Sequence, residues 1–546
     1  MRSNAPRLAE FDAVERAIVD HLFLLSPSYA VSVGLHEYDG KLPDLSSKAT
    51  ERWAAQADRL LARLRAIPID ALPPARRADR TMLELLLESP LFDLRESHEY
   101  ERNPMVYLGS ASVTAYLVRP YAPALRRAER IAELLEGVPR LLDEGRRRLQ
   151  PKLPKPFVEL ALSIGRGLPA HYADAVAFAR SAGENVGARV ERAASAAGAA
   201  VEAMLRWLSD ERLPSASEEF ALGAERFARL LYVREGLTTP IAEIERRGRD
   251  DLARNQSRLA AIAREAGRSV PELLQAMTED RATAESLIPT ARATVEAAKQ
   301  FVIDHDLVRV PSTATCRVEE TPVWARALST ASMDSPGPFE SASSEGVYYV
   351  TPVDPAWSPT QSEEWLKSLN RPVLKIVTVH EVYPGHYLQF LHLREAPGSL
   401  TRKVYFSPSF VEGWAHYTEQ LAIEAGLAQG APLLEVAQLH EALLRNCRLL
   451  VSIGLHTHGW SLKQATAFFE REAHLEHLPA QREAIRGTFN PEYFCYTLGK
   501  LAILELRERH LAGRFHGSLR AFHDTLLGFG SPPIGLLESL VAHAGP

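Results

Sequence analysis

Apolar residues recur every three or four positions through most of the N-terminal half of the chain, which is the spacing of an amphipathic helix. The clearest stretches are residues 13–25, 51–67, 80–94 and 173–211. Breaks rich in Pro and Gly separate these helices from one another rather than marking domain boundaries. We therefore expect a mainly α-helical protein, with an N-terminal helical region over residues 1–305.

The pattern changes between residues 306 and 355. There the segments LVRVPSTATCRVEETPVWARALS and EGVYYVTPV carry β-branched and aromatic residues bounded by Pro and Gly, and SPGPFESASSEG has the composition of a loop. Such runs are typical of short strands. Residues 306–546 are therefore expected to form a small sheet followed by further helices, continuous with the N-terminal region.

Two histidines lie close together in the helical pattern KIVTVHEVYPGHYLQFLH, just after the expected sheet. The familiar zinc-hydrolase motif is H-E-x-x-H, in which the two His share one face of a helix and the Glu acts as a general base. Here His386 follows His380 by six positions, so an ideal helix would place the two rings roughly 120° apart. The segment predicts a metal site only if the backbone between the two His is distorted.

Pro384 and Gly385 can produce that distortion. Pro384 has no N–H to donate to the carbonyl of His380, and Gly385 accepts unusual backbone angles. We expect a kink or a π-bulge that absorbs the two extra residues and brings His386 to the face of His380. The alternative is a buried, Pro-kinked helix whose histidines are ordinary core residues.

A third ligand is expected from another element, because a catalytic zinc with two His takes one more protein ligand and keeps one position open. Glu412, in the segment FVEGWAHYTE, is placed to supply it. Glu419 follows two helical turns later on the same face, where it can orient a ligand through a hydrogen bond. The aromatic neighbours predict that Glu412 is at least partly buried, where an unpaired carboxylate is costly.

These motifs resemble those of the bacterial domain-of-unknown-function family 885, which has an HExxPGH-type motif and a following EGWA-type segment. The chain carries them as HEVYPGHYLQ and VEGWAHYTE, with the family's Tyr-x-x-Gly-Lys pattern beginning at Tyr496. VEGWAHYTE is also similar to the N-E-G-F-A-x-Y-x-E helix of aminopeptidase-N-like gluzincins. That resemblance implies a large helical, gluzincin-like zinc-peptidase fold with Glu412 as a zinc ligand. Ser452 stands where the family pattern leads us to expect an Asp.

If the three predicted ligands hold Zn²⁺, the chemistry is amide hydrolysis. The ion polarises a carbonyl and lowers the pKa of water, while Glu381 transfers the proton to the leaving amine. The tetrahedral intermediate needs a donor aimed at its oxyanion. In the gluzincins that the chain resembles, a Tyr or a His from a later helix supplies this donor, which implies Tyr496 first and His456 second.

Substrate recognition is open at this stage. A cation near the metal would hold the free C-terminal carboxylate of a peptide; Arg448 and Lys500 are the candidates, and Arg445 is expected at the surface. A carboxylate that holds a free amine would instead indicate an aminopeptidase, and the sheet region offers Glu319, Glu320 or Glu345.

An edge strand beside the metal pairs with extended substrate in many zinc peptidases. By analogy, residues 346–350, which include Gly346 and Tyr348, are the candidate strand for substrate binding. The alternative is a covering hairpin without substrate contact.

The amino-acid composition limits the classes of protein to which this chain can belong. The chain has 546 residues, 46% of them hydrophobic, which is ample for a large core. The net charge is −6, so the protein as a whole does not attract nucleic acid or an anionic membrane. The three Cys are too few and too scattered to form a disulfide framework. No apolar run is long enough to span a membrane, and the N-terminus does not have the pattern of a signal peptide. We therefore expect a cytoplasmic protein without nucleic-acid or membrane partners.

We predict a zinc-dependent hydrolase of peptide bonds, with residues 306–546 as its catalytic region. Its substrates would be short peptides or peptide-like molecules, cleaved in the manner of a carboxypeptidase or a dipeptidyl carboxypeptidase. Two alternatives stay open: a metal-dependent hydrolase of a non-peptide amide in small-molecule metabolism, and a helical binding protein with a vestigial site. The intact set of two His and two Glu argues against the last.

Overall fold

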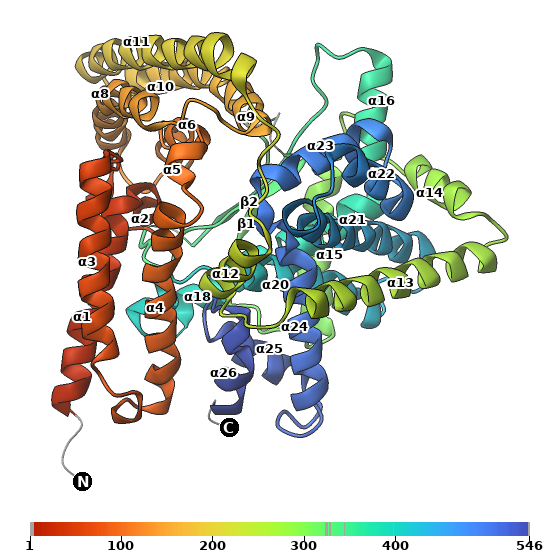
Figure 1. The fold of residues 1–546 in the computed structure, drawn as a ribbon. Helices are drawn as coiled ribbons and strands as arrows, with labels where there is room; N and C mark the ends of the chain where they lie inside the picture. The colour runs from red at the N-terminus through yellow and green to blue at the C-terminus, as the bar shows by residue number, and fades with distance from the viewer. Residues whose placement is uncertain (1–4, 323–325, 327–328, 343, 397, 544–546) are drawn as a thin grey trace. The chain divides into compact units, whose positions relative to one another are not determined.

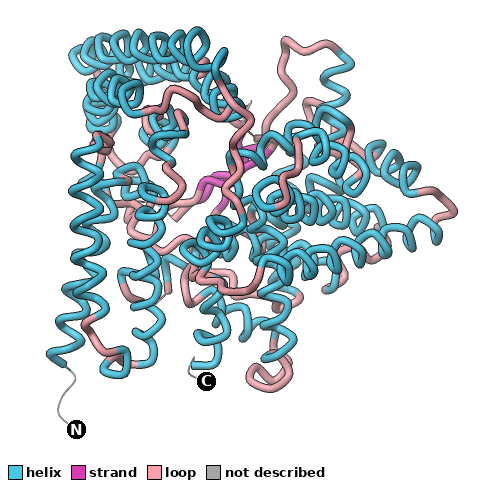
Figure 2. The backbone as a smooth tube through the Cα atoms, in the orientation of Figure 1, coloured by secondary structure: helices cyan, strands magenta, loops and turns pink. Residues whose placement is uncertain are grey.

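The computed structural model describes residues 5–322, 326, 329–342, 344–396 and 398–543. The chain divides into two compact units, each built from more than one segment. Unit 1 comprises Met1–Arg234, Pro336–Ser343 and Gly398–Val404; unit 2 comprises Glu235–Ser335, Ser344–Pro397 and Tyr405–Pro546. Helices dominate the described residues of both units (Figure 1, Figure 2), which confirms the prediction of a mainly α-helical protein.

Unit 1 consists of helices that bury stripes of Ala, Leu and Val spaced by three and four residues. In α3, for example, the side chain of Ser46 accepts a hydrogen bond from the backbone N–H of Ala49, and Trp53, Ala57 and Leu60 face the core. The longer helices are α1 (Ala5–Leu25), α3 (Ser47–Arg65), α4 (Pro74–Arg95), α8 (Ala124–Arg148), α9 (Lys155–Gly165), α10 (Leu168–Ala182), α11 (Glu184–Trp207) and α12 (Ala224–Glu235). The shorter ones are α2 (Pro27–Ser32), α5 (Glu99–Arg102), α6 (Met105–Gly109), α7 (Thr114–Val118) and α19 (Leu400–Val404).

Unit 2 contains the motifs that the sequence singles out. Its first helices are α13 (Ile241–Glu265), α14 (Val270–Glu279), α15 (Leu287–Asp304) and α16 (Pro359–Ser368). They are followed by α17 (Arg371–Glu381), α18 (His386–Glu395), α20 (Pro408–Glu424), α21 (Pro432–Thr457) and α22 (Leu462–Ala473). The last are α23 (His477–Phe489), α24 (Cys495–His510), α25 (Leu519–Leu527) and α26 (Leu537–His543).

A three-stranded sheet lies beside α17 and α18, as the composition of residues 306–355 predicts. The strands are β1 (Cys316–Glu320), β2 (Ala331–Asp334) and β3 (Gly346–Val350), in the order β1-β3-β2. β3 is parallel to β1 and antiparallel to β2. The hydroxyl of Tyr387 on α18 donates to the carbonyl of Thr315, next to β1, and a Cβ on Gly346 would lie 2.6 Å from the ring of Tyr387.

The division between the units differs from the expected boundary at residue 305, because α13 packs along α21 inside unit 2. A Cβ on Gly248 would lie 2.5 Å from the side chain of Leu449, so the two helices are in close contact there. Asn446 on α21 donates a hydrogen bond to Asp251 on α13 (2.8 Å), and both side chains are buried. Helices that precede the sheet in sequence thus support the same core as the motif helices.

Candidate metal centre

The helix that carries His380 ends directly after it, and a new helix begins at His386. In place of the usual four-residue spacing, the N–H of Gly385 donates to the carbonyl of Val379 (3.0 Å) and that of Leu388 to Val382 (3.2 Å), both across six residues. These two bonds absorb the two-residue insertion. The predicted distortion at Pro384 and Gly385 is therefore confirmed, although it is a full break between two helices and not a bulge within one.

The backbone at the end of α17 lies so close to residue 385 that only glycine fits at this position. A Cβ at this position would lie 1.7 Å from the carbonyl oxygen of His380 and 2.5 Å from that of Val379. Any other residue would push the start of α18 away from the end of α17. The glycine therefore fixes the distance between the two His-bearing helix ends.

The break brings His380 and His386 together with Glu412. Oε2 of Glu412 lies 3.4 Å from Nε2 of His380 and 3.3 Å from Nε2 of His386. The two imidazole planes are nearly perpendicular, with ring centroids 4.8 Å apart. Within the described residues these three side chains form the one group whose ligand atoms all lie within 4.8 Å of each other. All three predicted ligands thus converge on one point.

Helix α20 delivers Glu412 because it packs unusually closely against α24. A Cβ on Gly413 would lie 2.4 Å from the Cα of Gly499, and a Cβ on Gly499 would lie 1.7 Å from the carbonyl oxygen of Ser409. Glycine on both helices therefore lets the two backbones touch. α20 begins where the side chain of Ser407 accepts a hydrogen bond from the N–H of Phe410 (3.0 Å).

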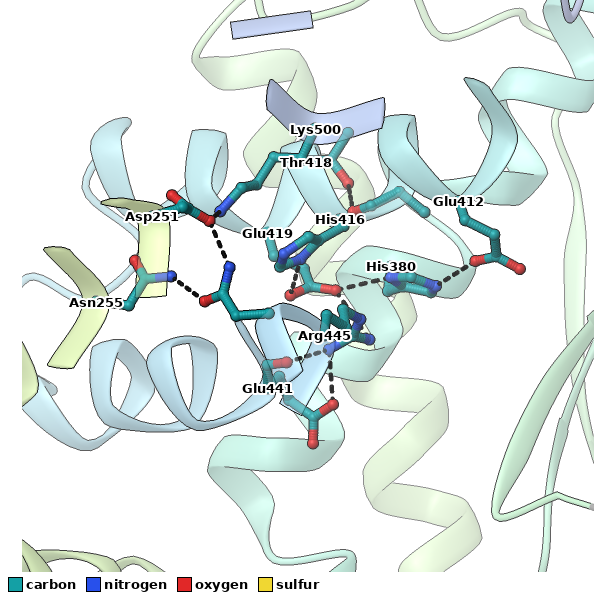
Figure 3. A network of polar contacts seen from close by, with 12 residues as sticks. Asp251, Asn255, His380, Glu412, His416, Thr418, Glu419, Glu441, Arg445 and Lys500 are labelled. Atoms are coloured by element: carbon teal, nitrogen blue, oxygen red, sulfur yellow. Dashed lines mark hydrogen bonds and ion pairs between the residues drawn. The ribbon is translucent and has the colours of Figure 1, made fainter. Parts of the chain in front are cut away.

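Glu419 is the fully buried anchor of the site (Figure 3). Nδ1 of His380 donates to its Oε1 (2.7 Å), Nδ1 of His416 donates to its Oε2 (3.2 Å), and Nη2 of Arg445 lies 3.2 Å from Oε1. Burial raises the pKa of Glu419, but Arg445 and the two histidines outweigh it and hold the carboxyl well below its usual range. An ionised carboxylate only accepts hydrogen bonds, so His380 must carry a proton on Nδ1, and its Nε2 faces Glu412.

The donor set fits a zinc ion. Two imidazole nitrogens and one carboxylate oxygen are a ligand set of catalytic zinc sites. Oε2 of Glu412 is buried and has no hydrogen-bond partner among the described residues, which is costly without a cation. Burial raises the pKa of Glu412, but the neighbouring His386 and His380 hold it well below its ordinary value. Burial lowers the pKa of His380, yet the nearby carboxylate of Glu412 and the hydrogen bond to Glu419 raise it to about 9, so the surroundings favour positive charge.

Glu381 follows His380 at the end of α17. It is partly exposed, and it makes no hydrogen bond or ion pair with another described residue. Burial raises the pKa of Glu381, while the charges of His386 and His380 oppose that rise. The carboxyl group is therefore available to accept a proton from a molecule at the site.

Tyr496 lies next to the predicted ligands, whereas His456 has another partner. The ring of Tyr496 is 6.4 Å from that of His380, centroid to centroid, and burial raises the pKa of its hydroxyl to about 12. The hydroxyl therefore keeps its proton and can donate. Nε2 of His456 lies 2.8 Å from the carbonyl of Gly487 in the core, so that nitrogen is already used.

The structure corrects the two predicted carboxylate anchors. Lys500 is fully buried, and its ammonium lies 2.6 Å from Oδ2 of Asp251, so it has no access to substrate. Arg448 donates through two nitrogens to the two oxygens of Glu483, at 2.8 Å each. Both cations are neutralised inside the fold, because a buried charge without a partner is strongly unfavourable.

Arg445 was expected at the surface, and this expectation is wrong. It is buried, and besides Glu419 it donates to the side chain of Glu441 (2.7 Å). The signal for this role was present: Arg445 and Arg448 sit in a helix whose other residues are mostly apolar (LLRNCRLLVSIGL), and such charges must be paired. His416, in the second motif, was likewise not recognised as a partner of Glu419.

The proposed substrate strand does not have a free edge. β3, with Gly346 and Tyr348, is the middle strand and pairs with β1 on one side and β2 on the other. Tyr348 is fully buried, and its hydroxyl lies 3.5 Å from that of Thr378 on α17. Tyr348 therefore supports the helix of His380, and the prediction that residues 346–350 bind substrate as an edge strand is wrong.

The three carboxylates considered as amine anchors are occupied in ion pairs. Arg317 pairs with Glu319 (2.9 Å) and with Glu345 (2.6 Å). Arg326 pairs with Glu320 (3.0 Å). Each of the three carboxylates would therefore have to give up an ion pair before it could bind the free amine of a substrate.

Comparison with known families matches the sequence to one of them. The family model described as "Bacterial protein of unknown function (DUF885)" matches residues 27–541, nearly the whole chain. The chain belongs to this family. The resemblance noted from the HExxPGH-type and EGWA-type motifs is thereby confirmed, and the DUF885 description itself assigns no activity. No curated protein matches the sequence.

Two solved structures share the fold of this DUF885 protein. One, from Shewanella oneidensis, is described as a "putative lipoprotein of unknown function"; it has a TM-score of 0.81 and 22% identity, covering 98% of this chain and 100% of that chain. The other, described as a "putative lipoprotein from Colwellia psychrerythraea", has a TM-score of 0.80 and 18% identity, covering 98% and 99%. At these identities the likeness establishes the fold alone.

The descriptions of these two relatives contradict the expected cytoplasmic location. A lipoprotein is held at a membrane by attached acyl chains, so the lack of a long apolar segment was no argument for the cytoplasm. In the described part of the chain, no helix is long and apolar enough to cross a membrane.

Proposed function

We propose that this protein is a zinc-dependent hydrolase that cleaves peptide or amide bonds, with His380, His386 and Glu412 as the metal ligands. The observation that carries the proposal is the approach of both Nε2 atoms to Oε2 of Glu412, at 3.4 and 3.3 Å. A helix break with two hydrogen bonds across six residues makes this convergence possible. A gluzincin-like relationship of the fold is part of the same proposal.

Each residue has a chemical task in this reaction. Bound zinc would supply Lewis acidity toward the scissile carbonyl and toward water. Glu381 takes a proton from the attacking water and returns it to the leaving amine. Tyr496 donates a hydrogen bond to the carbonyl oxygen as negative charge develops on it. Glu419 holds the imidazole of His380 in the tautomer that leaves Nε2 as a ligand.

Metal analysis combined with a peptide assay tests the proposal. Purified wild-type protein should bind one zinc per chain and hydrolyse members of a short-peptide library. His386→Ala and Glu412→Ala should each lose zinc and activity, whereas Glu381→Gln should keep zinc and lose activity. If either ligand substitution leaves the zinc content unchanged, that residue is not a ligand. If the zinc-loaded protein cleaves no peptide but hydrolyses another acyl-amine, the protein is a non-peptide amidase.

A further inference from the structure

Two arginines lie over the ring of Tyr496, and both are neutralised by buried or partly buried carboxylates. The guanidinium of Arg445 is 5.5 Å and that of Arg448 is 5.0 Å from the centre of the Tyr496 ring. Arg445 forms ion pairs with Glu419 and Glu441. Arg448 forms an ion pair with both carboxylate oxygens of Glu483 on α23. For either arginine to bind a substrate anion, a buried carboxylate would have to be left unpaired, which is costly.

Arg486 is the third cation, and it has no such partner. It lies on α23 three residues after Glu483, so the two side chains share one face of the helix, and Glu483 is in contact with Arg448. Arg486 is partly exposed, and its side chain makes no hydrogen bond or ion pair within the part of the chain that the structure describes. Its side chain is therefore free to bind an anion beside the Arg448–Glu483 pair.

The electrostatics of the neighbours are consistent with this position. Burial raises the pKa of Tyr496, and the charges of Arg448 and Arg486 oppose that rise. Burial likewise raises the pKa of Glu483, and Arg448 and Arg486 lower it. The guanidinium of Arg486 thus acts on the same two groups as the neutralised Arg448, while its own hydrogen bonds remain available.

We propose that Arg486 binds the free C-terminal carboxylate of the substrate, so that the enzyme acts on peptides at their carboxyl end. This inference rests on the proposed hydrolase function. A guanidinium fits a carboxylate through two parallel hydrogen bonds, which fixes the orientation of the peptide as well as its charge. Arg448, which binds Glu483 one turn before Arg486, lies 5.0 Å from the centre of the Tyr496 ring, and that ring is 6.4 Å from the ring of His380. A peptide held beside Glu483 would thus extend along the phenol toward the predicted metal ligands. The Arg448–Glu483 pair is a positioning element beside this anchor.

Matched peptides test the anchor. Blocked tripeptides with a free C-terminal carboxylate should be cleaved by the zinc-loaded wild type about 10- to 100-fold more efficiently than the same sequences amidated at the C-terminus, the factor expected for a charge-assisted hydrogen bond. Arg486→Gln should bring this ratio close to one, chiefly by raising KM for the free acids. Arg486→Lys should retain part of the preference, because it keeps the charge but loses the two-bond geometry. Arg482→Gln, an exposed arginine one turn earlier on α23, is the matched control and should leave the ratio at the wild-type value.

The outcomes separate this inference from the proposed function. If the wild type cleaves amidated and free-acid peptides equally well, or if Arg486→Gln keeps the full preference, Arg486 is not the anchor, although the hydrolase activity stands. If the zinc-loaded protein cleaves neither form, the proposed peptidase function fails and the anchor fails with it. Equal zinc content and equal thermal unfolding of the Arg482 and Arg486 variants establish that any change in the ratio comes from recognition and not from damage to the fold.

Discussion

Oε1 of Glu419 lies 2.7 Å from Nδ1 of His380, with both side chains removed from solvent. Hydrogen bonds of this kind fix the tautomer of a metal-binding histidine and raise its basicity. Arg445 and His416 hold the same carboxylate from two other directions, so its orientation is determined before any metal arrives.

We therefore expect Glu419→Gln to lower the affinity for zinc about 10- to 100-fold, because the amide lacks the charge that orients His380. Competition with a zinc chelator of known affinity measures this loss directly. Glu424→Gln, an exposed carboxylate at the end of the same helix, is the control and should bind zinc as the wild type does. Equal zinc affinity of the Glu419 and Glu424 variants would contradict the role assigned to Glu419.

Gly385→Ala should displace His386 from the metal site. The added methyl group would meet the carbonyl oxygen of His380 at 1.7 Å, so the start of α18 must move. We expect a loss of about 2 kcal/mol or more in the free energy of unfolding, together with loss of bound zinc. Gly513→Ala is the matched control in unit 2, since a Cβ there meets nothing within 4 Å. Urea unfolding and zinc analysis of both variants check this, and a Gly385 variant with full zinc content would refute it.

The sequence contains enough information to predict the helix break but not its geometry. Pro384 lacks an N–H, and Gly385 tolerates close approach, so a distortion is predictable from local chemistry alone. The N–H groups near the break must bond to carbonyls other than their usual ones. The choice of carbonyl depends on the relative position of α17 and α18, and packing against α20 and the sheet determines that position. This is why the sequence predicts a kink or a π-bulge, whereas the chain forms two helices joined by hydrogen bonds across six residues.

Partners from distant elements were the least predictable part of the site. The apolar pattern indicates that Arg445 and Lys500 lie on long helices. It does not indicate that Arg445 pairs with Glu419, or Lys500 with Asp251, on other helices. The same holds for the sheet, where the strand that comes last in sequence inserts between the other two. Motif spacing predicted that His380, His386 and Glu412 lie together, whereas charge pairing and strand order follow from tertiary structure.

The buried Lys500–Asp251 pair should show strong coupling in stability. Lys500→Met leaves the carboxylate of Asp251 buried without its main counter-charge, at a cost of about 3–5 kcal/mol. Adding Asp251→Asn removes the unpaired charge and keeps an acceptor for Asn446, so the double variant should be more stable than Lys500→Met alone. Urea unfolding of the two singles and the double gives the coupling energy. Additive losses would mean that the pair contributes nothing beyond its separate contacts.

Glu235 should make the stability of the protein depend on pH. It is buried, and its carboxyl accepts hydrogen bonds from the hydroxyl of Ser407 and from the N–H of Ser409 (2.9 Å). Burial raises the pKa of Glu235 to about 7, against an ordinary value of 4.5. The folded state therefore binds this proton more tightly than the unfolded state, so its contribution is complete below about pH 4.5 and is lost as the pH rises to about 7.

Glu235→Gln removes this pH dependence, because the amide resembles the protonated carboxyl group at every pH. Between pH 5 and pH 8 the wild type should lose roughly 3 kcal/mol of unfolding free energy relative to the variant. Urea unfolding of both proteins at the two pH values measures it, and the effects of all other titrating groups cancel in the comparison. Parallel stability curves would show that Glu235 titrates at its ordinary pKa, and the two hydrogen bonds from Ser407 and Ser409 would then suffice to keep it ionised in the core.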